Sequence, residues 1–143
     1  MTENISANRN KFGINGKAVK RSRRMIEGKN FTHLATLMPD GSPQVTPVWV
    51  DYDDGFILVN TTEERIKYRN VKRDPRIALS IIDSDDPYTM LAMRGKVVQT
   101  AAKGADEHIE KLSMKYIGKK FPWKSPGQKR IILKIKPERV MFD

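Results

Sequence analysis

The chain has 143 residues, of which 38% are hydrophobic, so it suits one compact domain with a modest core. Its 27 Lys and Arg outnumber its 17 Asp and Glu, and the formal net charge of +10 favours anionic partners such as nucleic acid, anionic membrane or phosphorylated small molecules. The absence of cysteine excludes disulfides, thiolate nucleophiles and Cys-type zinc sites. No metal site is expected, because His33 and His108 lie far apart and no HExxH motif or paired-carboxylate spacing accompanies them.

The ends of the chain carry no targeting signal that we recognise. No apolar run approaches the roughly 18 residues of a membrane span, and the N-terminus is polar where a signal peptide would be apolar. We therefore expect a cytoplasmic protein without membrane contact. Residues 1–16 are predicted to be a flexible segment and residues 17–143 the folded domain.

The first predicted helix covers residues 17–27, with apolar residues on one face and Gly28 just beyond its end. Lys20, Arg21, Arg23 and Arg24 form the densest cationic run of the chain. This run indicates either a solvated helix face or a face that binds an anion or nucleic acid.

Three strands follow, joined by turns that contain Asp and Gly, at residues 31–37, 44–52 and 56–59. Pro47 removes a backbone donor from the second of them and predicts an edge strand or a bulge. The third is an unbroken apolar run and is expected to be buried on both faces.

Thr61 and Glu64 have the spacing of a capping box, which predicts a helix from Thr61 to about Arg73, closed by Asp74 and Pro75. Further elements are predicted in the second half: strands at residues 76–82, 88–100 (bent at Gly95) and 129–136, and a helix at residues 105–116. About six strands and three helices, with antiparallel hairpins dominating, indicate a mainly β protein with helices (α+β), a small barrel decorated by helices.

Four segments of the chain occur in an order that resembles a known family. They are ATLMPDGSPQVTPVWV (35–50), NTTEERIKYRNVKRDPRIALSI (60–81), DPYTMLAMRGKV (86–97) and FPWKSPGQKRIILKIKPERV (121–140). Together they resemble the pyridoxamine 5′-phosphate oxidase-like split β-barrel proteins, and especially the branch that uses the deazaflavin coenzyme F-420. The resemblance implies a six-stranded antiparallel split β-barrel of the FMN-binding type. It also implies a homodimer with two equivalent cofactor sites at the interface.

The resemblance further implies which residues bind the cofactor. They are Gln44, Thr46, Pro47, Val48 and Trp49 along the ring, Asn60, Thr61, Thr62, Arg65 and Lys67 near the phosphate, and Asn70 and Trp123. Structural roles stay open: Pro47 as an edge proline, Thr61 as a cap, Asn70 as a capping or buried hydrogen-bonding residue and Trp123 as an interface anchor. In related proteins, the segments that match Tyr88, Met90, Trp123 and Arg130 approach the site of the other subunit.

By this resemblance the chain is an oxidoreductase that uses coenzyme F-420 for hydride transfer to or from a small unsaturated organic substrate. The long anionic tail of F-420 suits the basic residues 20–24 and 72–76. FMN is the alternative cofactor, and a carrier of flavin, deazaflavin or haem without turnover is the alternative class. Nucleic-acid binding is not expected, because neither an RNP motif nor a helix-turn-helix signal occurs.

Overall fold

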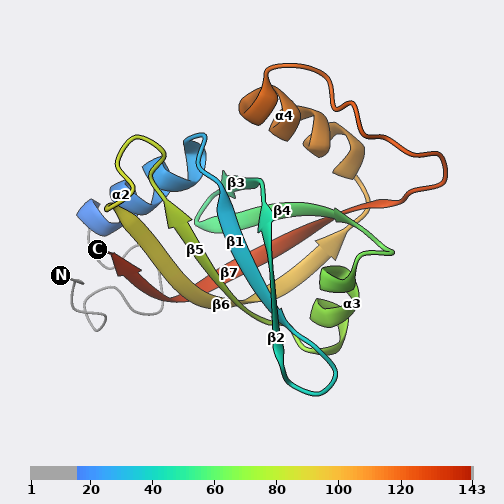
Figure 1. The fold of residues 1–143 in the computed structure, drawn as a ribbon, viewed down its shortest axis with the longest axis horizontal. Coiled ribbons are helices and arrows are strands. Elements are labelled where there is room, and N and C mark those ends of the chain that lie inside the picture. Colours follow the sequence, from blue (N-terminus) through green and yellow to red (C-terminus); the bar gives the residue numbers. More distant parts are fainter. Residues whose placement is uncertain (1–15, 143) are drawn as a thin grey trace.

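The computed structural model describes residues 16–142, and the predicted N-terminal segment lies outside them except for Gly16. In this part of the chain seven strands and three helices occur, in the order α2 (Gly16–Glu27), β1 (Thr32–Leu37), β2 (Pro43–Val48), β3 (Val50–Asp53), β4 (Phe56–Thr62), α3 (Ile66–Arg73), β5 (Arg76–Ile82), β6 (Met90–Ala101), α4 (Ala105–Ile117) and β7 (Arg130–Phe142) (Figure 1). None of these three helices is long and apolar enough to cross a membrane.

The strands form one antiparallel sheet in the order β2-β1-β5-β6-β7-β4-β3. The prediction of six strands is wrong, because residues 44–52 form two strands that break at Trp49. β2 pairs with β1, whereas β3 pairs with β4 at the other end of the strand order. Since one residue joins the two ends of the order, the sheet curls into a half-barrel. β2 lies at one of its edges, where a proline is tolerated.

The barrel encloses the main core of the molecule. Alternate residues of the strands point inward, and the largest fully buried side chains include Leu34, Ile57, Leu91, Leu133 and Ile135. Each such side chain contributes on the order of 1.5–3 kcal/mol by leaving water. The prediction that residues 56–59 are buried on both faces is wrong, because β4 alternates between fully and partly buried side chains in the ordinary two-residue period of a strand.

The helix predicted from Thr61 begins later than expected. Thr61 and Thr62 continue β4, where they pair with Ile131 and Arg130 of β7, and α3 starts at Ile66. Arg65 occupies the N-cap position in an extended conformation and makes no side-chain cap bond, so the capping-box interpretation is wrong. Pairing with β7, which is longer than the predicted strand, keeps both threonines in the sheet.

Gly95 is the bend predicted within the long strand. The pairing of β6 with β7 shifts register between Arg94 and Gly95, and a Cβ at Gly95 would lie 2.2 Å from the carbonyl oxygen of Lys136. Only glycine permits this approach. Beyond β6, α4 stands at one end of the barrel, and the loop after it returns to β7 (Figure 1).

Candidate functional site

A cavity of about 420 Å³ is lined by residues of the barrel, of α4 and of the loop that follows α4. Its volume lies within the range of roughly 300–1,000 Å³ that is common for small-molecule sites. The structure brings together nine of the twelve predicted site residues in its lining: Pro47, Val48, Trp49, Asn60, Thr61, Thr62, Arg65, Lys67 and Trp123. Six lining residues were not among those twelve: Phe31, Ile109, Leu112, Phe121, Gln128 and Arg130.

Three cations of the lining make the cavity electropositive. Arg65 and Lys67 would point about 200° apart on one helix, but Arg65 precedes α3 in extended backbone, and both side chains reach the same cavity. Burial, and then the charge of Arg65, lower the pKa of Lys67, and the same two causes lower the pKa of Arg130 from β7. Cations that repel one another in a half-buried pocket favour an anionic ligand.

The hydroxyl of Thr62 is a buried polar group that lines this cavity. Thr62 is 1% exposed, and its Oγ1 has no hydrogen-bond partner within residues 16–142. The Glu64 carboxylate, whose pKa is lowered chiefly by its own backbone N–H and to a smaller degree by this hydroxyl, does not reach hydrogen-bond geometry with it. A buried hydroxyl without a partner costs free energy, so an anionic oxygen in the cavity would satisfy it. The residues present therefore fit a phosphorylated ligand.

Aromatic rings form another part of the cavity wall. Trp49 stacks on Tyr116 of α4 with ring centroids 5.2 Å apart and an angle of 4° between the planes. Phe121 and Trp123 from the loop after α4 lie 6.1 and 6.3 Å from the Trp49 ring. Glu110 of α4 holds this loop, because its carboxylate accepts a bond from the Phe121 N–H at 3.0 Å. The wall suits a planar, largely apolar ring.

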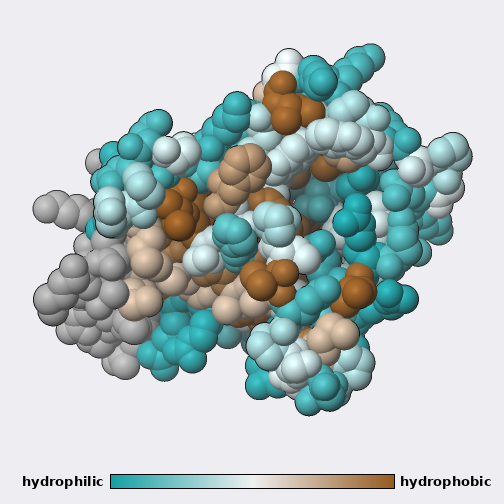
Figure 2. Space-filling view, viewed as in Figure 1, coloured by the Kyte–Doolittle hydropathy of each residue, from teal (hydrophilic) through white to brown (hydrophobic). Residues whose placement is uncertain are grey.

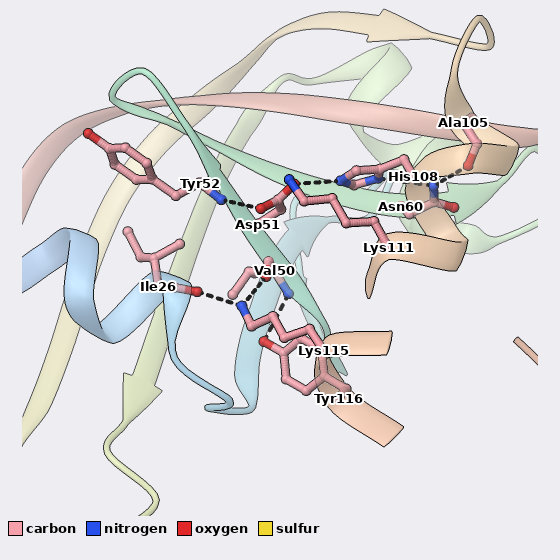
Figure 3. A network of polar contacts seen from close by, with 10 residues as sticks. All are labelled: Ile26, Val50, Asp51, Tyr52, Asn60, Ala105, His108, Lys111, Lys115 and Tyr116. Atoms are coloured by element: carbon pink, nitrogen blue, oxygen red, sulfur yellow. Dashed lines mark hydrogen bonds and ion pairs between the residues drawn. The ribbon is translucent and has the colours of Figure 1, made fainter. Parts of the chain in front are cut away.

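A polar network joins α4 to β3 and β4 beside the cavity (Figure 3). Asp51 Oδ2 lies 3.2 Å from His108 Nε2 and accepts a bond from Lys111 Nζ at 3.1 Å. Burial opposes the charge of Asp51, but the bonds from His108 and Lys111 outweigh it and lower the pKa of Asp51 to about 2. His108 Nδ1 lies 3.2 Å from Nδ2 of Asn60, a residue of the cavity lining. The network is therefore connected to the cavity lining through Asn60.

A second set of bonds ties the end of α4 to α2 and β3 (Figure 3). Lys115 Nζ donates to the carbonyl oxygens of Ile26 at 2.8 Å and Val50 at 2.7 Å. Burial lowers the pKa of Lys115 to about 8, although nearby carboxylates oppose this shift. The Tyr116 hydroxyl donates to the Asn30 carbonyl at 2.8 Å and accepts the Val50 N–H at 3.2 Å. These bonds fix Tyr116, on which Trp49 stacks.

Some predicted site residues lie outside the cavity. Gln44 and Thr46 are half-buried on β2, on the same face as Val48 but beyond the lining. Asn70 is buried and donates to Thr36 Oγ1 at 2.9 Å, so it joins α3 to β1 in a structural role. Tyr88 is 89% exposed, and neither it nor Met90 lines the cavity.

Trp123 and Arg130, which the resemblance implied would approach the site of a partner subunit, both line the cavity of their own chain. The described basic side chains of residues 21–24 and 72–76 do not line it. Two of them form exposed ion pairs, Arg23 with Glu27 and Arg76 with Asp74. No three His, Asp or Glu side chains in the described part of the chain are placed to hold a metal ion.

Sequence reasoning missed the network of Asp51 and His108, having considered His108 only as a metal ligand. The predicted helix contained a signal for this network. His108 lies four residues before Leu112, so it shares the apolar face that Ile109, Leu112 and Tyr116 define. A polar residue on a buried stripe needs a partner. The partner itself, Asp51, lies 57 positions away and gives no such signal.

Comparison with solved structures supports the fold. An F420 reductase is 33% identical, with 82% of this chain and 94% of that chain covered and a TM-score of 0.75. The conserved hypothetical protein Rv2991 from Mycobacterium tuberculosis is 23% identical over 87% of this chain and 83% of that chain, with a TM-score of 0.68. A Listeria innocua protein, provisionally described as a pyridoxamine 5′-phosphate oxidase, is 20% identical over 85% and 94% of the two chains, with a TM-score of 0.65. The last two show the fold alone.

The sequence pattern of the pyridoxamine 5′-phosphate oxidase family matches residues 18–142, which is nearly the whole described part of the chain. The curled antiparallel sheet and its helices agree with that match. The chain belongs to the pyridoxamine 5′-phosphate oxidase family.

Proposed function

We propose that this chain is an oxidoreductase that binds coenzyme F-420 in the cavity beside α4 and transfers hydride to or from a small unsaturated organic substrate. The observation that carries the proposal is the set of three cations, Arg65, Lys67 and Arg130, that line one cavity together with the buried Thr62. A phosphate there would accept a hydrogen bond from the Thr62 hydroxyl and neutralise the charge of the cations. The 33% identity with an F420 reductase favours the deazaflavin over other phosphorylated rings.

Each part of the cavity has a role in this proposal. Thr62, Arg65, Lys67 and Arg130 hold the phosphate, while Trp49 and the backbone of β2 near Pro47 flank the ring. When bound, the deazaflavin supplies the hydride chemistry. The lining holds no carboxylate, imidazole or phenol among the described residues, which suits a protein that binds and orients a cofactor rather than one that supplies an acid or base.

FMN is the second candidate cofactor. Its phosphate fits the same hydroxyl and cations, and the described basic side chains of residues 21–24 and 72–76, which are expected to meet the F-420 tail, lie outside the cavity. This leaves the lining itself without a feature that selects between the two cofactors. A carrier without turnover would use the same contacts, and it would differ in failing to transfer hydride to any acceptor.

The test is parallel equilibrium titration with F-420 and FMN, followed by fluorescence, for the wild type, Lys67→Ala and Lys103→Ala. Lys103 is exposed and lies outside both the cavity and the basic segments expected to meet the F-420 tail, so it controls for the loss of one positive charge. We expect tight F-420 binding that weakens at least about tenfold in Lys67→Ala and stays within about twofold in Lys103→Ala. Preference for FMN would reassign the cofactor, and binding of neither would refute the proposal. Hydride transfer from reduced F-420 to a panel of unsaturated acceptors then separates an enzyme from a carrier.

The outer face of the sheet supports a homodimer as part of the same proposal. A second cavity, of about 370 Å³, lies on this face and is lined mostly by apolar or small side chains of β1, β2, β5, β6 and β7. Val45 is 60% exposed there, and Figure 2 shows apolar side chains over the middle of the face. A second copy would remove this surface from water. Light scattering should give the mass of two chains for the wild type and of one chain for Ala78→Glu, which places a charge in this second cavity. The control Ala102→Glu adds the same charge at an exposed position outside that cavity, so it should keep the mass of two chains. A single-chain mass for the wild type refutes the dimer.

A further inference from the structure

Asn60 of β4 connects the cavity to the network behind it. Its Nδ2 donates to the carbonyl oxygen of Ala105 at 2.8 Å and lies 3.2 Å from Nδ1 of His108. Its Oδ1 accepts a bond from Nη1 of Arg130 at 3.3 Å. The amide therefore has its nitrogen toward α4 and its oxygen toward the cation of the cavity.

The orientation of this amide sets the tautomer of His108. The two hydrogens on Asn60 Nδ2 go to Ala105 and to His108 Nδ1, so Nδ1 must accept and carries no proton. The proton of the neutral imidazole is then on Nε2, which faces the ionised Asp51 carboxylate at 3.2 Å. Asp51 and Asn60 thus require the same tautomer from opposite sides of the ring.

We propose that His108 is a positioning residue for the anion-binding part of the site: it fixes the Asn60 amide, whose oxygen in turn holds the Arg130 guanidinium at the cavity. This inference rests on the proposed function, because it gives His108 a role in binding the phosphorylated cofactor. His108 itself lies outside the cavity lining, so its effect passes through Asn60.

The charges around His108 show why the relay depends on this ring. Asp51 and Asp53 face the same side of α4 from β3, and Glu107 and Lys111 belong to α4 itself. Lys111 is 68% exposed and bonds to Asp51 but not to Asn60, so it cannot replace the imidazole. Without an acceptor at Nδ1, the Ala105 carbonyl alone holds the amide nitrogen, so the amide is held less tightly and its oxygen is a less fixed acceptor for Arg130. Among the described residues Arg130 also contacts the Phe121 ring, 4.7 Å from its guanidinium carbon.

Two substitutions at His108 separate positioning from packing. His108→Leu fills the space but offers neither donor nor acceptor. His108→Gln can donate to Asp51 and accept from Asn60 without titrating. We expect His108→Leu to weaken cofactor binding about tenfold and His108→Gln to stay within about threefold of the wild type, in the titrations described above. If His108→Leu leaves binding unchanged, or if His108→Gln loses as much as His108→Leu, the proposal is overturned.

A double-mutant cycle tests whether the effect passes through Arg130. In the Arg130→Ala background, His108→Leu should cause less than about a twofold further loss of affinity, because the group that it positions is gone. A full tenfold further loss would show that His108 acts by another route and would overturn the proposal.

Nitrogen NMR of the cofactor-free protein distinguishes a failure of this inference from a failure of the proposed function. His108 should show the neutral ring with its proton on Nε2. The Arg130 guanidinium should rotate faster in His108→Leu than in the wild type or His108→Gln. A proton on Nδ1, or equal rotation in all three proteins, overturns the positioning role even if cofactor binds. If these signatures are found but neither F-420 nor FMN binds, the proposed function fails while the positioning of Arg130 by His108 stands.

Discussion

The substitution Thr62→Val should raise stability and lower cofactor affinity at the same time. Valine has nearly the same shape as threonine, and the Thr62 hydroxyl is buried without a hydrogen-bond partner among the described residues. Removal of such a hydroxyl removes a desolvation penalty on the order of 1–3 kcal/mol. We expect the free energy of unfolding to rise by about 1 kcal/mol. A hydrogen bond to a charged group contributes about 1.5–3 kcal/mol, so the same substitution should weaken phosphate-dependent binding roughly tenfold or more.

Thr32→Val is the matched control. Thr32 lies in β1, is fully buried and has an unpartnered hydroxyl within residues 16–142, but it does not line the cavity. Urea unfolding of the cofactor-free proteins should therefore show a similar gain of stability for both variants, while fluorescence titration with F-420 should show a loss for Thr62→Val alone. A clear loss of stability in Thr62→Val would mean that its hydroxyl has a partner within the fold. Equal affinities of Thr62→Val and the wild type would show that no anion meets this hydroxyl.

Three further predictions concern the framework of the site. Asp51→Asn should lower the free energy of unfolding by about 2 kcal/mol at pH 7, because the pKa of Asp51 falls from 3.8 to about 2 on folding. This stabilisation is complete above about pH 4 and is lost as the pH falls through 2. The difference between the variant and the wild type in urea titrations should therefore shrink on acidification, and a difference that stays constant refutes the prediction. Gly95→Ala should cost more than about 2 kcal/mol, since its Cβ would lie 2.2 Å from a backbone oxygen, whereas an unchanged melting temperature would contradict the bulge geometry. Asn70→Ala should lower stability by about 1–3 kcal/mol yet leave F-420 affinity within about twofold, and a large loss of affinity would return Asn70 to the site.

Local patterns predicted the elements whose signals lie within a few residues. The turn at Asp53, Asp54 and Gly55 joins β3 to β4 as expected, with positive φ at Asp54 and Gly55. Gly118 ends α4 in the left-handed conformation, and Asp74 closes α3 through its backbone N–H. These features depend on backbone preferences that each residue carries with it.

The errors arose where a distant strand decided the outcome. Thr61 and Glu64 satisfy the local capping rule, but Thr61 and Thr62 pair with Ile131 and Arg130 of β7, about 70 residues later, and the helix starts at Ile66. Residues 44–52 have the composition of one strand, and only the pairing of their two halves with β1 and β4 divides them. Nine of the twelve residues that the family resemblance implied for the site line one cavity, because a resemblance carries long-range information that propensity lacks.

Trp49 shows why this fold and this site could not be predicted separately. It is the single residue between β2 and β3, which lie at opposite ends of the strand order. Its backbone therefore joins the two edges of the curled sheet. Its side chain stacks on Tyr116 and lines the cavity, and Tyr116 in turn bonds to the Val50 N–H at the start of β3. The same contacts that dock α4 against the curled sheet therefore build the aromatic wall of the site. Because closure, docking and the wall share these contacts, a substitution that loosens α4 should open the cavity before it unfolds the barrel, whose main core lies in a separate apolar cluster.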